Sequence, residues 1–209
     1  MRTLNLISNP LVEHKLSFLR DVNTGSAEFR EITKEISRIL AYEAMKSWDE
    51  IKVTKIQTPI CETKVKRVSN PPIIVSIMRA GNGMMDAILS MIPFASAGHI
   101  GIYRDKYIGN TVEYYFKLPE KMKQKTIYLC DPMIATADTA IAAIDRLKQY
   151  EVGKIKILSI LASPSGIEKI HHFHPDVDIY TTSKEEGLNE KGYLIPGLGD
   201  AGDRLFKTK

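Results

Sequence analysis

The chain has little of what marks secreted, membrane-spanning or nucleic-acid-binding proteins. Only two cysteines, Cys61 and Cys130, occur in 209 residues, which is too few for a disulfide framework and predicts a reduced, cytoplasmic protein. No apolar run reaches the roughly 18 residues of a membrane span. Residues 1–5 also lack the apolar core of a secretory signal. The formal net charge of +4 is small. It suits phosphorylated small molecules and predicts no nucleic-acid partner, which would need a clustered basic face.

What the sequence does contain is a regular alternation of strand and helix patterns. Apolar residues spaced by three and four predict a helix over Ser26–Trp48, preceded by a shorter one over Pro10–Leu19. Further strands are expected at Ile73–Met78, His99–Tyr103, Ile127–Cys130, Ile155–Leu161 and Val177–Tyr180, with helices at Met84–Met91, Thr139–Tyr150 and Ile167–His171. This order predicts an α/β fold with a largely parallel sheet. In such folds ligands bind at the carboxyl ends of the strands.

Four segments are expected at the surface. Tyr103–Phe116 contains a Gly-Asn pair between alternating residues, which predicts a β-hairpin that either closes over a site as a lid or packs on another subunit. The basic stretches Lys64–Arg67 and Lys121–Lys125 are expected to be solvated loops. His171, His172 and His174 do not have the spacing of a tetrahedral metal site, so we expect a solvated helix end there.

The strongest local motif is Ile127–Thr139, where a buried strand ends in Asp131 and a loop of small and hydroxyl-bearing residues opens a helix. Backbone N–H groups at a helix N-terminus bind anions, and the hydroxyls of Thr136 and Thr139 add donors. The Asp131 carboxylate is placed to accept hydrogen bonds from two ribose hydroxyls. The alternative is a plain strand-to-helix turn with Thr139 as the N-cap, and this motif alone leaves both interpretations open.

Four segments, taken in order, resemble the uracil phosphoribosyltransferase family. Asp131–Thr136 resembles its PRPP-binding loop, and Gly187–Arg204 resembles its uracil-binding region over nearly the whole length of that region. Arg79–Gly81 after the first core strand and Tyr103–Arg104 after the second match in order and spacing. The likeness runs from about Asn70 to the C-terminus and is weaker in the N-terminal helices.

The resemblance implies a single domain with a type I phosphoribosyltransferase fold. Residues 1–50 would form a helical arm, 70–165 a PRPP-binding core and 176–209 a uracil-binding segment. The implied reaction transfers the 5-phosphoribosyl group of PRPP to N1 of uracil, giving UMP and pyrophosphate in pyrimidine salvage. Mg²⁺ is the implied cofactor, carried mainly by PRPP rather than by a dedicated protein site. A homodimer or homotetramer is implied, as are the nucleotide effectors GTP and CTP.

The resemblance also assigns roles to residues. The implied PRPP contacts are Arg79, Arg104, Asp131, Pro132, Met133, Ile134, Ala135, Thr136, Ala137, Asp138, Thr139 and Asp200. The implied uracil contacts are Leu194, Gly199, Asp200 and Ala201. Arg104, Asp131 and Asp200 are the expected catalytic residues, and a general-base role for Asp200 is a hypothesis. A guanidinium suits phosphate because its fork of N–H groups matches the phosphate oxygens.

Two sites depart from the family pattern. The family loop carries glycines after the threonine, whereas this chain has Ala137 and Asp138, and Lys207 stands where glycine is usual. A carboxylate about 4 Å from a phosphate costs on the order of 1 kcal/mol in water, so we expect the Asp138 side chain to turn outward.

Two rival functions are weighed against this one. The first is a phosphoribosyltransferase for another base, which the C-terminal segment argues against. The second is a regulator that senses PRPP or a nucleotide, binds RNA or DNA and has lost catalysis. Asp138 slightly favours the regulator, and the lack of a continuous basic face counts against it.

Overall fold

The computed structural model describes residues 3–104 and 111–208, and its centre is an eight-stranded sheet. The strands run in the order β1 (Thr3–Leu6), β10 (Asp178–Lys184), β9 (Ile155–Ala162), β7 (Ile127–Cys130), β4 (Ile73–Met78), β5 (Ser96–Arg104) and β6 (Thr111–Lys117), with β8 (Met133–Ile134) also paired to β9. Every pairing is parallel except that of β5 with β6. The predicted α/β class with a largely parallel sheet is confirmed.

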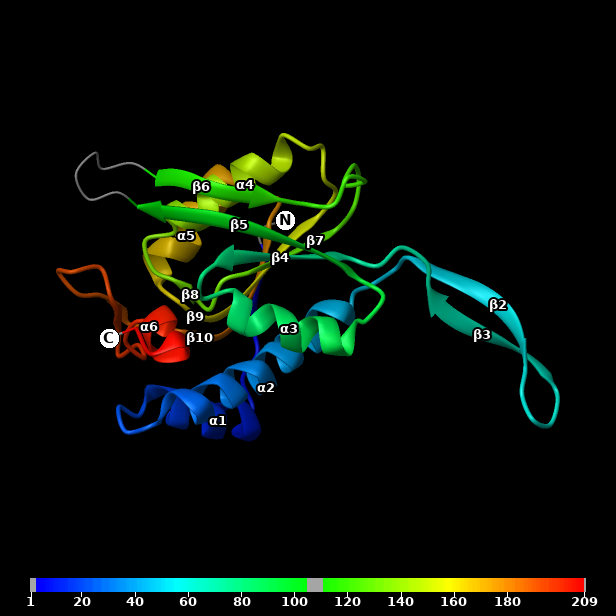
Figure 1. The fold of residues 1–209 in the computed structure, drawn as a ribbon, viewed down its shortest axis with the longest axis horizontal. Coiled ribbons are helices and arrows are strands. Elements are labelled where there is room, and N and C mark those ends of the chain that lie inside the picture. Colours follow the sequence, from blue (N-terminus) through cyan, green and yellow to red (C-terminus); the bar gives the residue numbers. More distant parts are fainter. Residues whose placement is uncertain (1–2, 105–110, 209) are drawn as a thin grey trace.

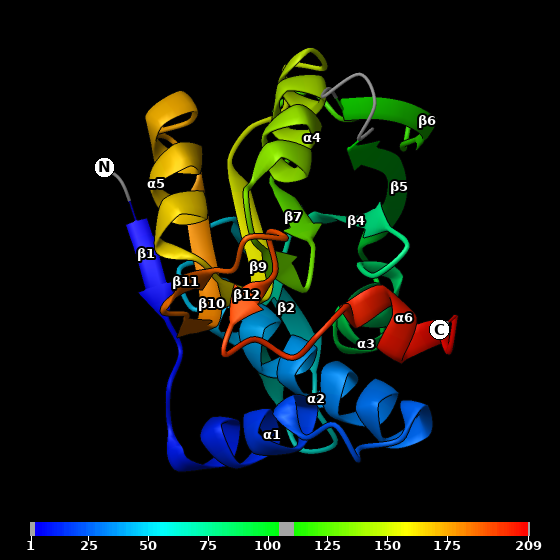
Figure 2. The same cartoon turned by 90° about the vertical axis from the view of Figure 1, so that its left-hand side faces the viewer.

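Helices cover both faces of this sheet (Figures 1 and 2). One face carries α1 (Pro10–Arg20), α2 (Ser26–Met45), α3 (Asn82–Met91) and α6 (Ala201–Phe206), and the other carries α4 (Asp138–Lys148) and α5 (Pro164–Phe173). All eight residues of β9 are buried. A strand covered on both sides needs apolar residues at nearly every position, and for this reason β4, β7 and β9 read as continuous apolar runs.

The first 45 residues contribute to the core as well as to the surface. Strand β1, which apolar patterning did not predict, pairs with β10 at the edge of the sheet. Helix α1 begins after Asn9, whose side chain accepts hydrogen bonds from the backbone N–H groups of Leu11 and Val12. Helix α2 begins at Ser26, where a helix start was expected, and Gly25 is its N-cap. Residues 3–45 are thus built into the domain.

The element that projects is a hairpin of β2 (Ile51–Gln57) and β3 (Glu62–Val68), which Figure 1 shows extending away from the sheet. The expectation that Lys64–Arg67 is a loop is wrong, because these residues lie in β3. A strand exposed on both sides lacks the period-two apolar pattern by which strands are recognised. Lys121–Lys125 lies between β6 and β7 outside any strand or helix, as expected.

The end of α5 is also less exposed than its sequence indicates. His172 is exposed, but His171 and His174 are buried. They are three residues apart, so both face the same side of the chain. The Nε2 atom of His174 lies 3.3 Å from Oδ1 of Asp145 on α4, and burial lowers the pKa of His174. The expectation of solvated histidines is therefore wrong at these two positions.

The predicted hairpin between Tyr103 and Phe116 is present as the antiparallel pair β5–β6. Residues 105–110, where the Gly-Asn turn was expected, lie outside the described residues. Within the described part of the chain, no helix combines the length and apolar character that crossing a bilayer requires.

Candidate functional site

Two loops leave the sheet side by side at its carboxyl edge. Strands β4 and β7 are parallel neighbours, with Ser76 opposite Cys130, so the segments that begin at Arg79 and Asp131 emerge together. A Cβ atom on Gly81 would lie 2.3 Å from the carbonyl oxygen of Cys130. Only glycine lets the turn before α3 approach β7 this closely, and this approach brings Arg79 near Asp131.

A pocket of about 220 Å³ forms where these loops meet the C-terminal segment. It is lined by Arg79, Ala80, Asp131, Pro132, Met133, Asp200, Ala201 and Gly202. The structure therefore brings together expected site residues from three segments that are far apart in the sequence. Gly83 of α3 packs against the Leu205 side chain of α6, a contact that holds the C-terminal segment beside the β4–α3 turn.

Asp131 is the ionisable group of this pocket with the most altered environment. Burial raises the pKa of its carboxyl group to about 7, and a weak hydrogen bond from the backbone N–H of Met133 opposes this rise. Hydroxyl groups that donate to this carboxyl would favour its ionised form. The preceding residue, Cys130, is buried in β7, and burial raises the pKa of its thiol, so it is not an activated nucleophile.

The loop after Asp131 is held by the turn between β9 and α5. Met133 and Ile134 pair with β9, and the backbone N–H and hydroxyl of Ser163 donate to the carbonyl oxygens of Ile134 and Ala135 at 2.8 and 2.6 Å. Ile134 is buried and does not line the pocket. The loop thus leads at a fixed position into the N-terminus of α4.

Ala137, and not Thr139, is the N-cap of α4. Its φ of 65° is left-handed, a conformation that costs a residue with a Cβ about 1–2 kcal/mol. The first backbone N–H groups of α4 have no acceptors within the helix, which is the arrangement that binds anions.

Asp138 turns toward α5. Its Oδ1 atom is 2.5 Å from Nζ of Lys169, and its Oδ2 atom accepts a hydrogen bond from the Thr136 hydroxyl at 2.8 Å. Asp138 does not line the pocket. No local motif identifies Lys169 as its partner, because the two residues are 31 positions apart.

The C-terminal segment contributes to the pocket through its last part. Asp200 is the N-cap of α6 and accepts a hydrogen bond from the backbone N–H of Asp203 at 2.9 Å, while Ala201 is buried beside it. Leu194 lies in β12 (Leu194–Ile195), which pairs with β11 (Gly187–Leu188), and it packs into the core. Leu194 and Gly199 do not line the 220 Å³ pocket.

The two expected arginines, Arg79 and Arg104, lie at the carboxyl ends of the neighbouring strands β4 and β5. Arg79 is more than half exposed, with one nitrogen 3.6 Å from Oδ1 of Asp203 and another 3.5 Å from the Thr208 hydroxyl. Arg104 ends β5, and its side chain lies outside the described part of the structure.

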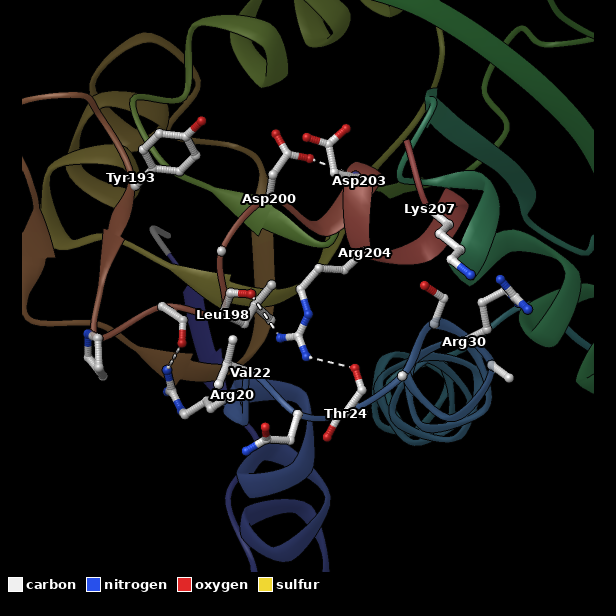
Figure 3. Close-up of a pocket in the computed structure, with 17 residues that line it drawn as sticks. Arg20, Val22, Thr24, Arg30, Tyr193, Leu198, Asp200, Asp203, Arg204 and Lys207 are labelled. Carbon is white, nitrogen blue, oxygen red and sulfur yellow. Dashed lines mark hydrogen bonds between the residues drawn. The ribbon is translucent and has the colours of Figure 1, made fainter. Parts of the chain in front are cut away.

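A second, larger cavity of about 1120 Å³ opens on the other side of Asp200, between the α1–α2 loop and residues 193–207 (Figure 3). Its most prominent cation, Arg204, donates to the carbonyl oxygens of Leu19, Asp21 and Leu198 and lies over the Phe29 ring. The guanidinium of Arg204 therefore already binds carbonyl oxygens within the protein. Two of the expected PRPP contacts, Asp131 and Arg79, line the smaller pocket.

Sequence reasoning missed the α1–α2 loop, which lines the larger cavity. The polar, glycine-containing stretch Asp21–Gly25 between two helices was the available signal.

Comparisons with known proteins agree with one another. The family model described as "Uracil phosphoribosyltransferase" matches residues 6–208. A curated uracil phosphoribosyltransferase from Staphylococcus aureus (strain Newman) is 47% identical over 210 residues, covering 100% of both chains. The solved structure of the AQ2163 protein from Aquifex aeolicus superimposes with a TM-score of 0.93 at 32% identity, covering 99% of each chain.

A more distant structure shares the fold alone. Adenine phosphoribosyl transferase from Trypanosoma brucei, in complex with AMP, pyrophosphate and ribose-5-phosphate, is 15% identical. It covers 92% of this chain and 88% of its own with a TM-score of 0.59.

Proposed function

The chain belongs to the uracil phosphoribosyltransferase family and transfers the 5-phosphoribosyl group of PRPP to uracil, and from this premise we propose which residues carry the reaction. The observation that supports the assignment is the pocket where Arg79, Asp131 and Asp200 meet from three distant segments. In the reaction, N1 of uracil attacks the anomeric carbon of PRPP as pyrophosphate leaves. Such a step depends on positioning and on stabilising developing charge, more than on a protein nucleophile.

Asp131 is proposed to hold the ribose. Its carboxyl group, with a pKa of about 7, is half ionised near neutral pH, and two ribose hydroxyls would donate to the ionised form. The backbone of 135–139 and the N–H groups that open α4 are proposed to hold a phosphate of PRPP. Pro132 and Met133 line the approach to this loop.

Arg79 and Arg104 are proposed to bind the pyrophosphate end of PRPP. The 3.6 Å contact of Arg79 with Asp203 is longer than a direct hydrogen bond, and the Arg79 side chain is more than half exposed, so substrate oxygens can replace this contact at little cost. Strands β4 and β5 are parallel neighbours, so the backbone of Arg104 lies at the same edge of the sheet.

Uracil is proposed to bind against Leu194 and the backbone of Gly199–Ala201. Backbone groups match the alternating acceptors and donor of the uracil edge, and small residues leave room for the base. The Asp200 carboxylate would then lie near N1, where a general base would act.

Mg²⁺ is proposed to arrive with PRPP. Across residues 3–104 and 111–208 no three His, Cys, Asp or Glu side chains gather as a metal cluster, and the pocket offers the carboxylates of Asp131 and Asp200. That donor set fits an ion held largely by phosphate oxygens and water. When bound, the ion neutralises charge on the leaving pyrophosphate.

We further propose a homo-oligomer, a dimer or tetramer, because the projecting hairpin exposes Ile51, Val53 and Ile60. Nucleotide effectors such as GTP and CTP, and a cytoplasmic location, are proposed from the family resemblance. The location agrees with free thiols at Cys61 and Cys130.

Calorimetric titration of Mg²⁺ and PRPP into the protein tests these assignments. Arg79→Ala should weaken PRPP binding by roughly 10- to 100-fold, since hydrogen bonds to charged groups contribute about 1.5–3 kcal/mol. The matched control is Arg38→Ala on α2, whose hydrogen bond to Ser90 is long and exposed. Equal PRPP affinity in Arg79→Ala and Arg38→Ala would refute the role of Arg79.

A further inference from the structure

A buried ion pair lies next to the proposed uracil-binding segment. Arg20 is the last residue of α1, and Glu185 follows β10. Two guanidinium nitrogens of Arg20 donate to the two carboxylate oxygens of Glu185 at 2.8 and 2.7 Å. The Glu185 side chain is 1% exposed and that of Arg20 is 26% exposed. This is the bidentate geometry in which such a pair is strongest and most directional.

Both partners also bind the backbone of Gly197. The N–H of Gly197 donates to Oε2 of Glu185 at 2.8 Å, and Nη1 of Arg20 donates to the carbonyl oxygen of Gly197 at 2.9 Å. Gly197 has a φ of 62°, and a Cβ atom there would lie 2.3 Å from the carbonyl oxygen of Leu194. The pair therefore fixes both peptide groups of a residue that lies between Leu194 and Gly199.

Ser183 completes this arrangement. Its hydroxyl donates to Oε1 of Glu185 at 2.7 Å and accepts from Nη2 of Arg20 at 3.2 Å. Burial raises the pKa of Glu185, but the hydrogen bonds from Arg20, Ser183 and Gly197 and the charge of Arg20 outweigh it, and the pKa is lowered overall. Glu185 is therefore ionised at neutral pH.

A buried, ionised pair is a weak source of stability, because desolvation offsets most of its Coulomb attraction. The pair instead fixes the position of the backbone that it binds. Neither Arg20 nor Glu185 lines the pocket of Arg79, Asp131 and Asp200, although Arg20 lines the larger cavity beside it (Figure 3). The direct link from the pair to the uracil-binding segment is its two hydrogen bonds to the backbone of Gly197.

We propose that Arg20 and Glu185 are positioning residues for uracil: by holding Gly197 they place the backbone of Gly199–Ala201 against the base. The inference rests on the proposed role of 194–201 in binding uracil. The PRPP loop is held separately, by β9 and Ser163. Loss of the pair should therefore raise the KM for uracil by a clearly larger factor than the KM for PRPP, to which only Asp200 of this segment contributes.

Steady-state kinetics with each substrate varied in turn provide the test. Glu185→Gln is nearly isosteric but removes the charge. It should raise the KM for uracil about 10- to 100-fold, since a misplacement of about 1 Å can cost about 100-fold. Arg20→Lys, which loses the fork, and the milder Ser183→Ala should raise it by smaller factors. In all three the KM for PRPP should rise by a clearly smaller factor than the KM for uracil.

The matched control is Glu35→Gln, which breaks the Lys15–Glu35 ion pair between α1 and α2 without touching Gly197. It should change neither KM. A parallel rise of both KM values in the Glu185, Arg20 and Ser183 variants would indicate a general structural role and overturn the proposal. If Glu185→Gln does not fold, as judged by circular dichroism, Arg20→Lys and Ser183→Ala decide the question.

Gly199→Ala separates this inference from the assignment on which it rests. Gly199 has a φ of 81°, so alanine there distorts the segment directly. A raised KM for uracil in Gly199→Ala, with unchanged values in Glu185→Gln and Ser183→Ala, would overturn the role of the ion pair and leave the uracil-binding segment in place. Unchanged values in all of these variants would overturn both.

Discussion

Removing Lys169 should weaken PRPP binding, although this residue lies on α5, outside the phosphate loop itself. Its ammonium group is 2.5 Å from Oδ1 of Asp138, the first residue of α4. Without Lys169, the negative charge of Asp138 would lose this cation at the helix end where we place a phosphate of PRPP. Lys169→Ala tests this directly, because it removes the cation and leaves the loop sequence intact.

The size of the effect follows from Coulomb's law. Two like charges about 4 Å apart repel by about 1 kcal/mol in water and about 4 kcal/mol at an effective dielectric of 20. The side chains of Asp138 and Lys169 are 23% and 42% exposed, so solvent screening keeps the value toward the lower end. We expect a loss of about 1–2 kcal/mol, which corresponds to a rise of roughly 5- to 30-fold in the KM for PRPP.

The assay is initial-rate UMP formation at saturating uracil and varied PRPP, at low and high salt. The double variant Asp138→Ala/Lys169→Ala should return the KM for PRPP to within about threefold of wild type, because it removes both charges. Lys148→Ala is the control, since its ion pair with Asp176 lies at the opposite end of α4. A Lys169→Ala enzyme with a wild-type KM at low salt would refute the reasoning, as would a double variant no better than the single one.

Three further predictions concern other parts of the molecule. Burial raises the pKa of Asp131 to about 7, so kcat/KM for PRPP should fall about tenfold per pH unit below 7 in wild type relative to Asp131→Asn. Between pH 3.8 and about 7 the raised pKa of Asp131 makes the folded protein bind more protons than the unfolded chain. The free energy of unfolding of wild type, relative to that of Asp131→Asn, should therefore decrease as the pH rises through this window. Asp200→Asn should keep the α6 cap, since asparagine caps as well as aspartate, yet lower kcat by about 100-fold or more if Asp200 is a general base; a full rate would end that hypothesis. Replacing residues 52–67 by a short turn should reduce the mass measured by light scattering to that of a monomer, and an unchanged mass would place the subunit contact elsewhere.

The order of the core elements could be predicted from sequence because buried parallel strands leave a strong local signal. Ile73–Met78 and Ile127–Cys130 match the observed strands end to end. The β2–β3 hairpin could not be found in this way, because exposed strands rich in lysine have no apolar period. Strand β1 is only four residues long, too short for periodicity to register.

Residues of the candidate site could be predicted where they lie on one continuous segment. Asp131 with its loop, and Asp200 with Ala201, were recognisable from adjacent residues, and the structure brings them to one pocket with Arg79. Lys169, Arg20 and Glu185 were not recognisable, because each forms an ion pair with a residue that only the fold places beside it. The burial of His171 and His174 depends in the same way on where α5 packs.

The most direct test of the account is product formation from PRPP and Mg²⁺ with uracil, cytosine, adenine or hypoxanthine, using wild type and Asp131→Ala. The account predicts UMP from uracil alone in wild type, and a rate lower by about 100-fold or more in Asp131→Ala, since misplaced ribose loses the benefit of alignment. Product from another base at a comparable rate, or an undiminished rate in Asp131→Ala, would contradict it.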